Sequence, residues 1–135
     1  MKLPAALRRA SVIAYCAIIF YLSSRSKFPE VETWYPGFMP DPAPIAHFFL
    51  YAVLCLIAWN DFRSEPAAWL NRRAPLFAVI FCALYGLSDE YHQSFVPNRH
   101  CTLVDFMIDV AGAAAAMFFI SLIRKRKSGG KIAKE

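Results

Sequence analysis

The residues best suited to chemistry are two pairs of carboxyl groups in the second half of the chain. Asp89 and Glu90 are adjacent, and Asp105 and Asp109 lie four residues apart in an apolar segment. Four residues make about one helical turn, so the two aspartates of the second pair share one helix face. Titratable groups gathered at one depth are what general acid–base catalysis requires.

A histidine on an earlier apolar segment is expected at the same depth as these carboxyl groups. His47 is followed one helical turn later by Tyr51, so both side chains lie on one face. One interpretation makes Glu90 and Asp109 a general base and acid, assisted by His47. The alternative is that His47 only forms a hydrogen bond at a membrane boundary. No established catalytic motif is present, so the sequence leaves open whether the protein is an enzyme.

Arg99 is the only Lys or Arg between residues 88 and 102, and two roles are open for it. Its planar guanidinium group can pair with a neighbouring carboxyl group and fix the loop. It can also bind a phosphate or a lipid headgroup at two points. The residues expected to contact a ligand are Tyr51, Asp89, His92, Gln93, Arg99 and Asp105.

The same side chains include residue types that bind metal ions, but their spacing does not predict a metal site. No H-E-x-x-H motif or equivalent pattern connects the histidines to the acidic residues. No cofactor site is visible either. Ser88 and Ser94 lie near His92, yet neither has the surroundings of a serine nucleophile.

Four apolar stretches must position these residues: Ala10 to Leu22, Ala43 to Trp59, Ala74 to Leu87, and Leu103 to Ile123. The chain is 58% hydrophobic and 19% charged, which is unlike an ordinary soluble domain. The stretches lack the alternation of membrane strands. The sequence therefore predicts an all-α membrane protein, a bundle of four transmembrane helices.

The first three stretches are short for a membrane span and are expected to extend into their flanks. The first helix begins near Pro4 if Arg8 and Arg9 extend toward the interface. The third continues to Gln93, which places Gly86, Glu90 and Gln93 on one face and Tyr85, Asp89 and His92 on a neighbouring one. A turn at Pro97-Asn98 follows.

On the fourth helix, Gly112 and Ala116 continue the face of Asp105 and Asp109, and such small residues let a neighbouring helix approach.

The distribution of basic residues predicts the orientation in the membrane. Twelve of the fifteen Lys and Arg residues lie before the first helix, between the second and third helices, or after the fourth. The positive-inside rule therefore places both termini in the cytoplasm and the acidic residues on the extracytoplasmic side. Residues 23–42, rich in proline and aromatic residues, are expected to cap that side.

We divide the chain into a membrane domain at residues 1–123 and a basic tail at residues 124–135. The tail is expected to be disordered and to contact anionic lipid.

Several of these motifs resemble the VanZ-like family of bacterial membrane proteins. They are Ser23-Ser24, His47-x-x-x-Tyr51, Asp89-Glu90-x-x-Gln93-x-x-x-Pro97-x-Arg99, and Asp105-x-x-x-Asp109-x-x-Gly112. Ala43-Pro44 stands where many relatives carry an acidic residue and a lysine. The resemblance implies a multi-pass protein of the bacterial cytoplasmic membrane and a link to teicoplanin-type glycopeptide susceptibility.

The sequence leaves three functions open. The first is binding of a lipid headgroup, a lipid-linked small molecule or a lipoglycopeptide at the outer leaflet. The second is an intramembrane enzyme that acts on a lipid-linked substrate. The third, a small transporter, rests mainly on Asp109 and lacks the broken helices or inverted repeats of transporters. The expected partners are membrane lipids and not nucleic acid, and the oligomeric state stays open.

Overall fold

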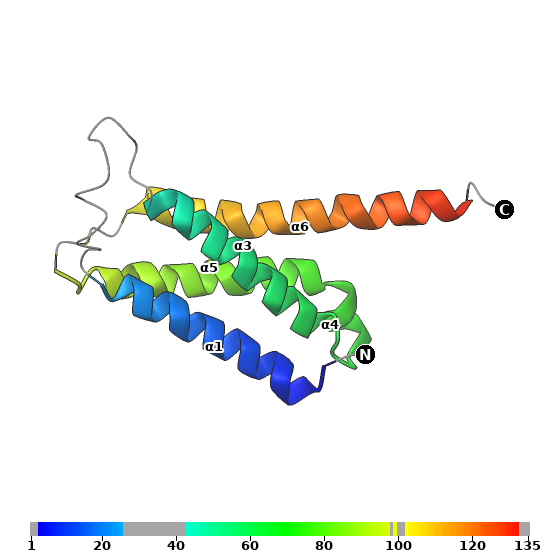
Figure 1. The fold of residues 1–135 in the computed structure, drawn as a ribbon, viewed down its shortest axis with the longest axis horizontal. Helices are drawn as coiled ribbons and strands as arrows, with labels where there is room; N and C mark the ends of the chain where they lie inside the picture. Colours follow the sequence, from blue (N-terminus) through cyan, green and yellow to red (C-terminus); the bar gives the residue numbers. More distant parts are fainter. Residues whose placement is uncertain (1–2, 26–42, 98, 100–101, 133–135) are drawn as a thin grey trace.

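The structure, a computed structural model, describes residues 3–25, 43–97, 99 and 102–132, with side chains to Arg126 in the last helix. This part of the chain is helical (Figure 1). The helices are α1 (Ala5–Ser23), α3 (Ala43–Phe62), α4 (Ala68–Arg72), α5 (Ala74–Gln93) and α6 (Leu103–Ile132).

The predicted helix boundaries agree closely with the structure. The starts at Ala43, Ala74 and Leu103 are confirmed, and so is the extension of α5 to Gln93. Proline in the first turn of α3 and α5 favours these starts, because its fixed φ suits a helix and its missing N–H would be unpaired there. Thr102 begins α6 as an N-cap, with its hydroxyl oxygen 3.1 Å from the Asp105 amide nitrogen.

The four long helices run in alternating directions (Figure 1). The end of α1, the start of α3, the end of α5 and the start of α6 lie together, and we call this the acidic end. The start of α1, the end of α3, α4 and the start of α5 lie at the opposite side, which we call the basic end. The start of α1 and the end of α6 therefore lie on the same side of the molecule, as the predicted topology requires.

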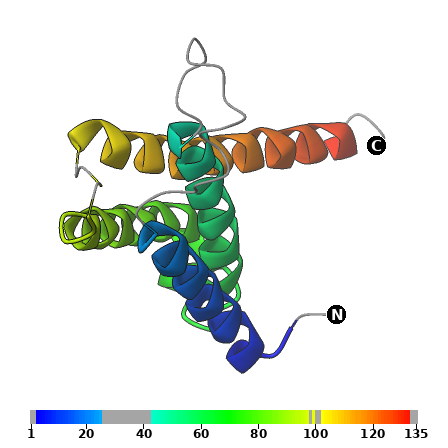
Figure 2. The same ribbon diagram turned by 60° about the vertical axis from the view of Figure 1, so that its left-hand side comes forward.

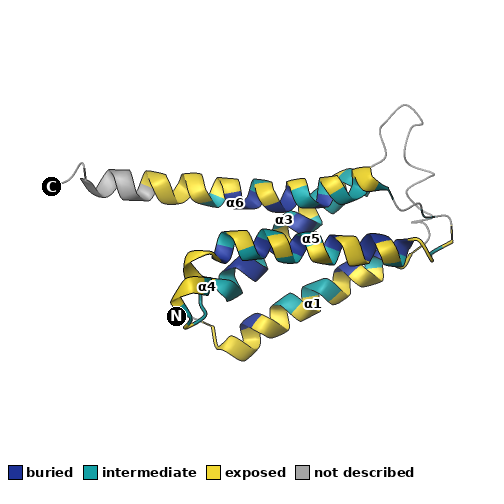
Figure 3. Cartoon of the chain, turned by 180° about the vertical axis from the view of Figure 1, so that it is seen from behind, coloured by how far each residue is buried: buried dark blue, intermediate teal, exposed yellow. Residues whose placement is uncertain are grey.

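α3 is the central element and packs against α1, α5 and α6. It crosses α5 and α6, which run side by side (Figure 2). Its buried residues recur at helical spacing, among them Tyr51, Leu54, Cys55 and Ala58. In Figure 3 the buried positions concentrate where α3, α5 and α6 meet, whereas α1 is mostly exposed. The core therefore lies among three helices, and α1 covers one side of it.

Among the described residues, three helices are long and apolar enough to cross a membrane: α1, α3 and residues Leu103–Arg126 of α6. The sequence predicted four. α5 is as long as α3, but its last turns carry Asp89 and Glu90 and lower its apolar character. The described part of the chain is thus all-helical, and its three candidate spans indicate a membrane protein.

Arg8 differs from its expected role. It does not extend toward water but is buried, with its Nε 3.2 Å from Oδ1 of Asp61. The sequence pattern could not predict this ion pair, because its partners lie 53 residues apart.

Two further segments differ from the expected elements. The connection after α3 contains the short helix α4, and α6 continues to Ile132 through residues expected to be disordered. Lys and Arg are good helix formers, which favours the continuation from Arg124 to Lys127. The expected cap at residues 26–42 lies outside the described residues.

Candidate functional site

The acidic end joins α3 to α6 through a histidine–aspartate pair. Nδ1 of His47 lies 3.2 Å from Oδ1 of Asp109. The Asp109 side chain is fully buried, and the His47 side chain is 13% exposed. When the carboxyl group is ionised it can only accept, so Nδ1 carries the hydrogen and Nε2 becomes the basic nitrogen. This arrangement can orient His47 to accept a proton.

Tyr51 and Gly86 complete the surroundings of this pair. The Tyr51 ring stacks on His47 with 6.4 Å between the ring centroids. A Cβ on Gly86 would lie 3.3 Å from Tyr51 and 3.4 Å from Oδ2 of Asp109, so glycine leaves room for both side chains. Among the described residues, neither the Tyr51 hydroxyl nor Oδ2 of Asp109 has a hydrogen-bond partner. Unpaired buried polar atoms are costly, which makes this spot unusual within the core.

A second contact joins the ends of α1 and α5. The hydroxyl of Ser23 donates to Oδ2 of Asp89 at 2.8 Å, and the Gln93 side-chain amide donates to the same oxygen at 3.1 Å. All three side chains are buried. The other Asp89 oxygen, Oδ1, has no hydrogen-bond partner in the described part of the chain. Asp89 is therefore held by uncharged donors.

A third contact links α5 to the start of α6 through Thr102. The Thr102 amide donates to Oε2 of Glu90 at 3.0 Å, and its hydroxyl donates to Oδ2 of Asp105 at 2.7 Å. Glu90 is buried, whereas Asp105 is half-buried. The two aspartates on one face of α6 thus have different surroundings. Asp109 faces the core, and Asp105 completes the helix cap.

His92 and Arg99 lie around this group in different ways. The His92 ring stacks on Phe20 of α1, with 4.2 Å between the centroids. Arg99 follows the turn after α5, where its amide donates to the Val96 carbonyl at 3.1 Å. Its Nε donates to the Arg25 carbonyl at 3.2 Å. Asn98 of the predicted turn lies outside the described residues.

The Arg99 guanidinium has no carboxyl partner among the residues that the structure describes. The alternative in which Arg99 pairs with Asp89, Glu90 or Asp105 is therefore not what the structure shows.

The sequence predicted which helix ends lie together, but three residues that contribute to the site were not predicted from it. Ser23 belonged to the family motif, yet its role as a donor to Asp89 depends on the packing of α1 against α5. Thr102 carried a signal, because a threonine three residues before an aspartate is typical of a helix N-terminus. For Gly86 the sequence predicted only that it shares a helix face with Glu90 and Gln93. Within the described residues, no three His, Cys, Asp or Glu side chains form a group that could hold a metal ion.

Gly112 shows how closely α6 approaches α3. A Cβ at this position would overlap the backbone carbonyl of Phe48. The predicted role of Gly112, to let a neighbouring helix approach, is confirmed. Because Gly112 lies about one turn beyond Asp109, this close approach also brings Asp109 within reach of His47.

The VanZ/LLP1 family pattern matches residues 10–124, which include every residue of the group at the acidic end. The chain belongs to the VanZ/LLP1 family. The family resemblance seen in the sequence is confirmed, and the protein is a VanZ-like membrane protein.

One relative is similar over nearly the whole VanZ/LLP1 chain. It is the uncharacterized protein C11E3.10 of Schizosaccharomyces pombe (strain 972 / ATCC 24843), which is 29% identical over 136 residues. The match covers 94% of this chain and 75% of the relative. Because this relative comes from a yeast, family membership alone does not specify a bacterial membrane. No solved structure matches the chain.

Proposed function

We propose that this VanZ-like protein binds an anionic headgroup, of a lipid or a lipidated ligand, at the acidic end of the bundle. Arg99 carries the proposal. It lies at the rim of a group rich in carboxyl groups and yet leaves its terminal amino groups without a carboxyl partner in the described part of the chain. A guanidinium group placed in this way is suited to a phosphate or carboxylate of a ligand.

A second arginine at the rim supports the same role. Arg25, whose carbonyl accepts from Arg99, donates to the Tyr21 hydroxyl at 3.0 Å and lies over the Tyr21 ring. It too has no carboxyl partner among the described residues. Two positive charges at this rim would balance the repulsion between an anionic headgroup and the carboxyl groups of the site.

The buried carboxyl groups supply the acceptors for the rest of such a ligand. Oδ1 of Asp89 and Oδ2 of Asp109 have no donor among the described residues. Together with the exposed edge of His47 they favour a headgroup that carries hydroxyl or amino groups beside its anionic group. Tyr51, Glu90, His92, Gln93 and Asp105 then form the surrounding polar wall.

We further propose that α5 is a fourth transmembrane helix, with the acidic end on the extracytoplasmic side and both termini in the cytoplasm. The exposed apolar residues of α5 form a stripe suited to lipid: Leu76, Ile80, Leu84 and Leu87. In intact cells an impermeant thiol reagent should label Ser94→Cys and not Asn71→Cys, in a chain whose native cysteines are replaced. The opposite pattern would reverse the topology.

Native mass spectrometry of the purified full-length protein tests headgroup binding. Phosphatidylglycerol carries the proposed phosphate and hydroxyl groups, and diacylglycerol of the same chain length lacks the phosphate. Arg99→Gln should weaken binding of phosphatidylglycerol about tenfold, because a hydrogen bond to a charged group contributes about 1.5–3 kcal/mol. Arg73→Gln removes the same charge at the basic end and serves as the control. Equal binding by both variants would refute the proposal.

A second function has its own supporting observation, the His47–Asp109 pair. A buried aspartate that orients a partly exposed histidine is an arrangement that activates a hydroxyl group or a water. In this alternative the protein is an intramembrane enzyme that acts on a lipid-linked substrate, with His47 as the base and Glu90 as a further acid or base.

Lipid profiling separates the two functions. An enzyme predicts that a deletion strain and a His47→Gln strain accumulate the same lipid-linked species, whereas an Arg73→Gln strain does not. Lipid profiles identical to the wild type in both strains would exclude the enzyme. The family resemblance also predicts altered glycopeptide susceptibility, which teicoplanin sensitivity of the same strains would test. It predicts a bacterial cytoplasmic membrane as the location, which membrane fractionation would test.

A further inference from the structure

A cavity of about 560 Å³ lies at the basic end, away from the site proposed above. Four arginines from different parts of the chain line it: Arg8, Arg63, Arg72 and Arg124. The remaining lining is neutral, with Asn60, Ser64 and Asn71 among it. A cavity of this size falls within the range of small-molecule sites. Its charge predicts an anionic occupant.

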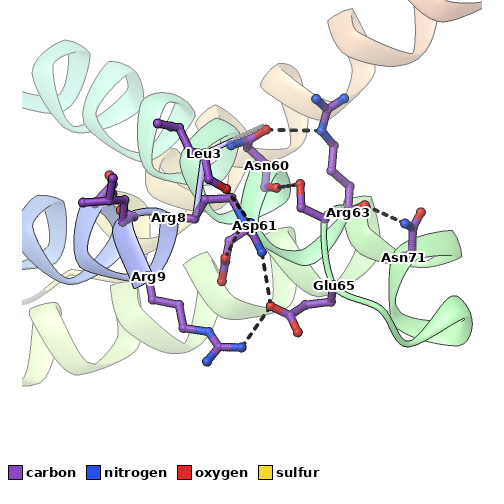
Figure 4. Close-up of polar contacts among 11 residues, drawn as sticks. Leu3, Arg8, Arg9, Asn60, Asp61, Arg63, Glu65 and Asn71 are labelled. Atoms are coloured by element: carbon purple, nitrogen blue, oxygen red, sulfur yellow. Dashed lines mark hydrogen bonds and ion pairs between the residues drawn. The ribbon is translucent and has the colours of Figure 1, made fainter. Parts of the chain in front are cut away.

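Arg8 forms a wall of the cavity and is already neutralised (Figure 4). It contacts Oδ1 of Asp61 at 3.2 Å and Oε1 of Glu65 at 3.6 Å, and it donates to the Leu3 carbonyl at 2.9 Å. Its donors and its charge are thus used within the protein.

The other three arginines keep their charge available. Arg63, Arg72 and Arg124 form no ion pair with a carboxyl group in the described part of the chain, although all three line one cavity. Like charges gathered in this way repel one another, which disfavours the empty arrangement and favours a bound anion. The excess positive charge of the cavity therefore comes from these three side chains.

The segment that carries Arg63 is fixed by local hydrogen bonds. Nε of Arg63 donates to the side-chain oxygen of Asn60 at 3.3 Å, and the guanidinium lies 4.5 Å from the centroid of the Trp59 ring. The Asn71 side chain of α4 donates to the Arg63 carbonyl at 2.6 Å, visible in Figure 4. Such pre-arrangement reduces the entropy lost on binding.

We propose that this cavity binds the phosphate group of an anionic membrane lipid. Guanidinium groups match phosphate oxygens in geometry as well as charge. Exposed apolar residues nearby favour a lipid over a free phosphate, because they place the cavity at the level of the headgroups. Leu3 at the cavity wall, Trp69 on α4 and Ile123 beside Arg124 are 55%, 60% and 51% exposed. Tryptophan is typical of that level.

The predicted topology agrees with this occupant. The basic end is the side that the positive-inside rule assigns to the cytoplasm, where anionic lipids attract basic segments. The site lies at the opposite end of the bundle from Arg99, so the two lipid sites would face different leaflets.

Lipid binding to the full-length protein tests this proposal. The probe is phosphatidylglycerol, with soluble glycerol 3-phosphate as the free-phosphate arm. Native mass spectrometry of the wild type should detect two bound lipids, which the variants assign to the two ends of the bundle. Arg72→Gln combined with Arg124→Gln should weaken the lipid of the basic end at least tenfold, because each substitution removes charged hydrogen bonds. Arg99→Gln should leave that lipid in place.

The matched control combines Arg73→Gln with Lys125→Gln, which removes two exposed positive charges from neighbouring positions that do not line the cavity. Equal loss in both double variants would reduce the effect to net charge and refute the proposal. Tight binding of glycerol 3-phosphate at the same arginines would refute the assignment to a lipid. If the double variant does not fold, Arg124→Gln against Lys125→Gln gives the same comparison.

Discussion

At the basic end, Asp61 and Glu65 face the guanidinium groups of Arg8 and Arg9, whereas at the acidic end Asp109 faces an imidazole ring. Asp89, also at the acidic end, faces a hydroxyl and an amide. Each end therefore places acidic side chains at a boundary of the bundle.

The two ends differ in how the charges of their acidic side chains are balanced. The acids of the basic end are neutralised by arginine. Within the described residues, Asp89 and Asp109 each keep one oxygen without a donor. Proteins commonly give up stability at functional sites, so the contrast supports the proposal that the acidic end binds a ligand.

Removing the cation that neutralises the acidic side chains of the basic end should produce the largest loss of stability. Arg8→Leu leaves Asp61 and Glu65 partly buried without their main cation. We expect the free energy of unfolding to fall by about 3 kcal/mol, the lower part of the range for a broken buried ion pair. Chemical unfolding in detergent, followed by circular dichroism, measures it.

Arg9→Gln is the control for this change. The Arg9 side chain is 61% exposed, and its bond to Glu65 should contribute less than about 1 kcal/mol. Equal losses for the two variants would mean that the basic end is not held by buried pairing.

A second substitution tests the helix contact that positions Asp109. Gly112→Ala would place a methyl group on the Phe48 carbonyl and force α3 and α6 apart. Overpacking of this kind costs about 1–3 kcal/mol. Gly86→Ala is the matched variant, because its Cβ would meet only side chains, Tyr51 at 3.3 Å and Asp109 at 3.4 Å, which can shift by a few tenths of an ångström, whereas the Phe48 carbonyl belongs to the backbone. A smaller loss for Gly112→Ala than for Gly86→Ala would contradict the account.

The smallest effect on stability is expected at Tyr51. Its buried hydroxyl has no hydrogen-bond partner among the described residues, so Tyr51→Phe should change the free energy of unfolding by less than about 0.5 kcal/mol. Tyr85→Phe removes a hydroxyl that donates to the Cys16 carbonyl at 2.6 Å and should cost about 1 kcal/mol. If Tyr51→Phe destabilises more than Tyr85→Phe, the hydroxyl is structural.

The helices were predictable because their signals are local. Apolar runs and the prolines near the starts of α3 and α5 fix the beginnings of those helices, and the spacing of Gly86, Glu90 and Gln93 predicted that they share one face, which is buried. The spacing of Asp105 and Asp109 likewise predicted only a shared face, and it did not show that one would be buried and the other would complete a cap.

The pairings could not be predicted, because they depend on the packing of distant segments. Ser23 and Asp89 lie 66 residues apart, and His47 and Asp109 lie 62 apart. The basic cavity had no sequence signal, because its arginines come from α1, the connection after α3, α4 and α6. Counting basic residues predicted a side of the membrane, and only the three-dimensional arrangement showed that four of them share one cavity.

One measurement tests the contrast between the two ends most directly, because it makes the same substitution at each. Asp61→Asn and Asp109→Asn both replace a carboxyl group by an amide of nearly the same shape. Asp61→Asn should lower the free energy of unfolding by about 1.5–3 kcal/mol, since the amide oxygen can still accept from Arg8 but no longer balances the charge of the buried guanidinium.

Asp109→Asn should leave the free energy of unfolding unchanged or raise it. The amide oxygen still accepts from His47, and a charge within a membrane helix is costly. Headgroup binding should weaken in the same variant. A loss of stability for Asp109→Asn as large as that for Asp61→Asn would show that the acidic end is a structural lock like the basic end.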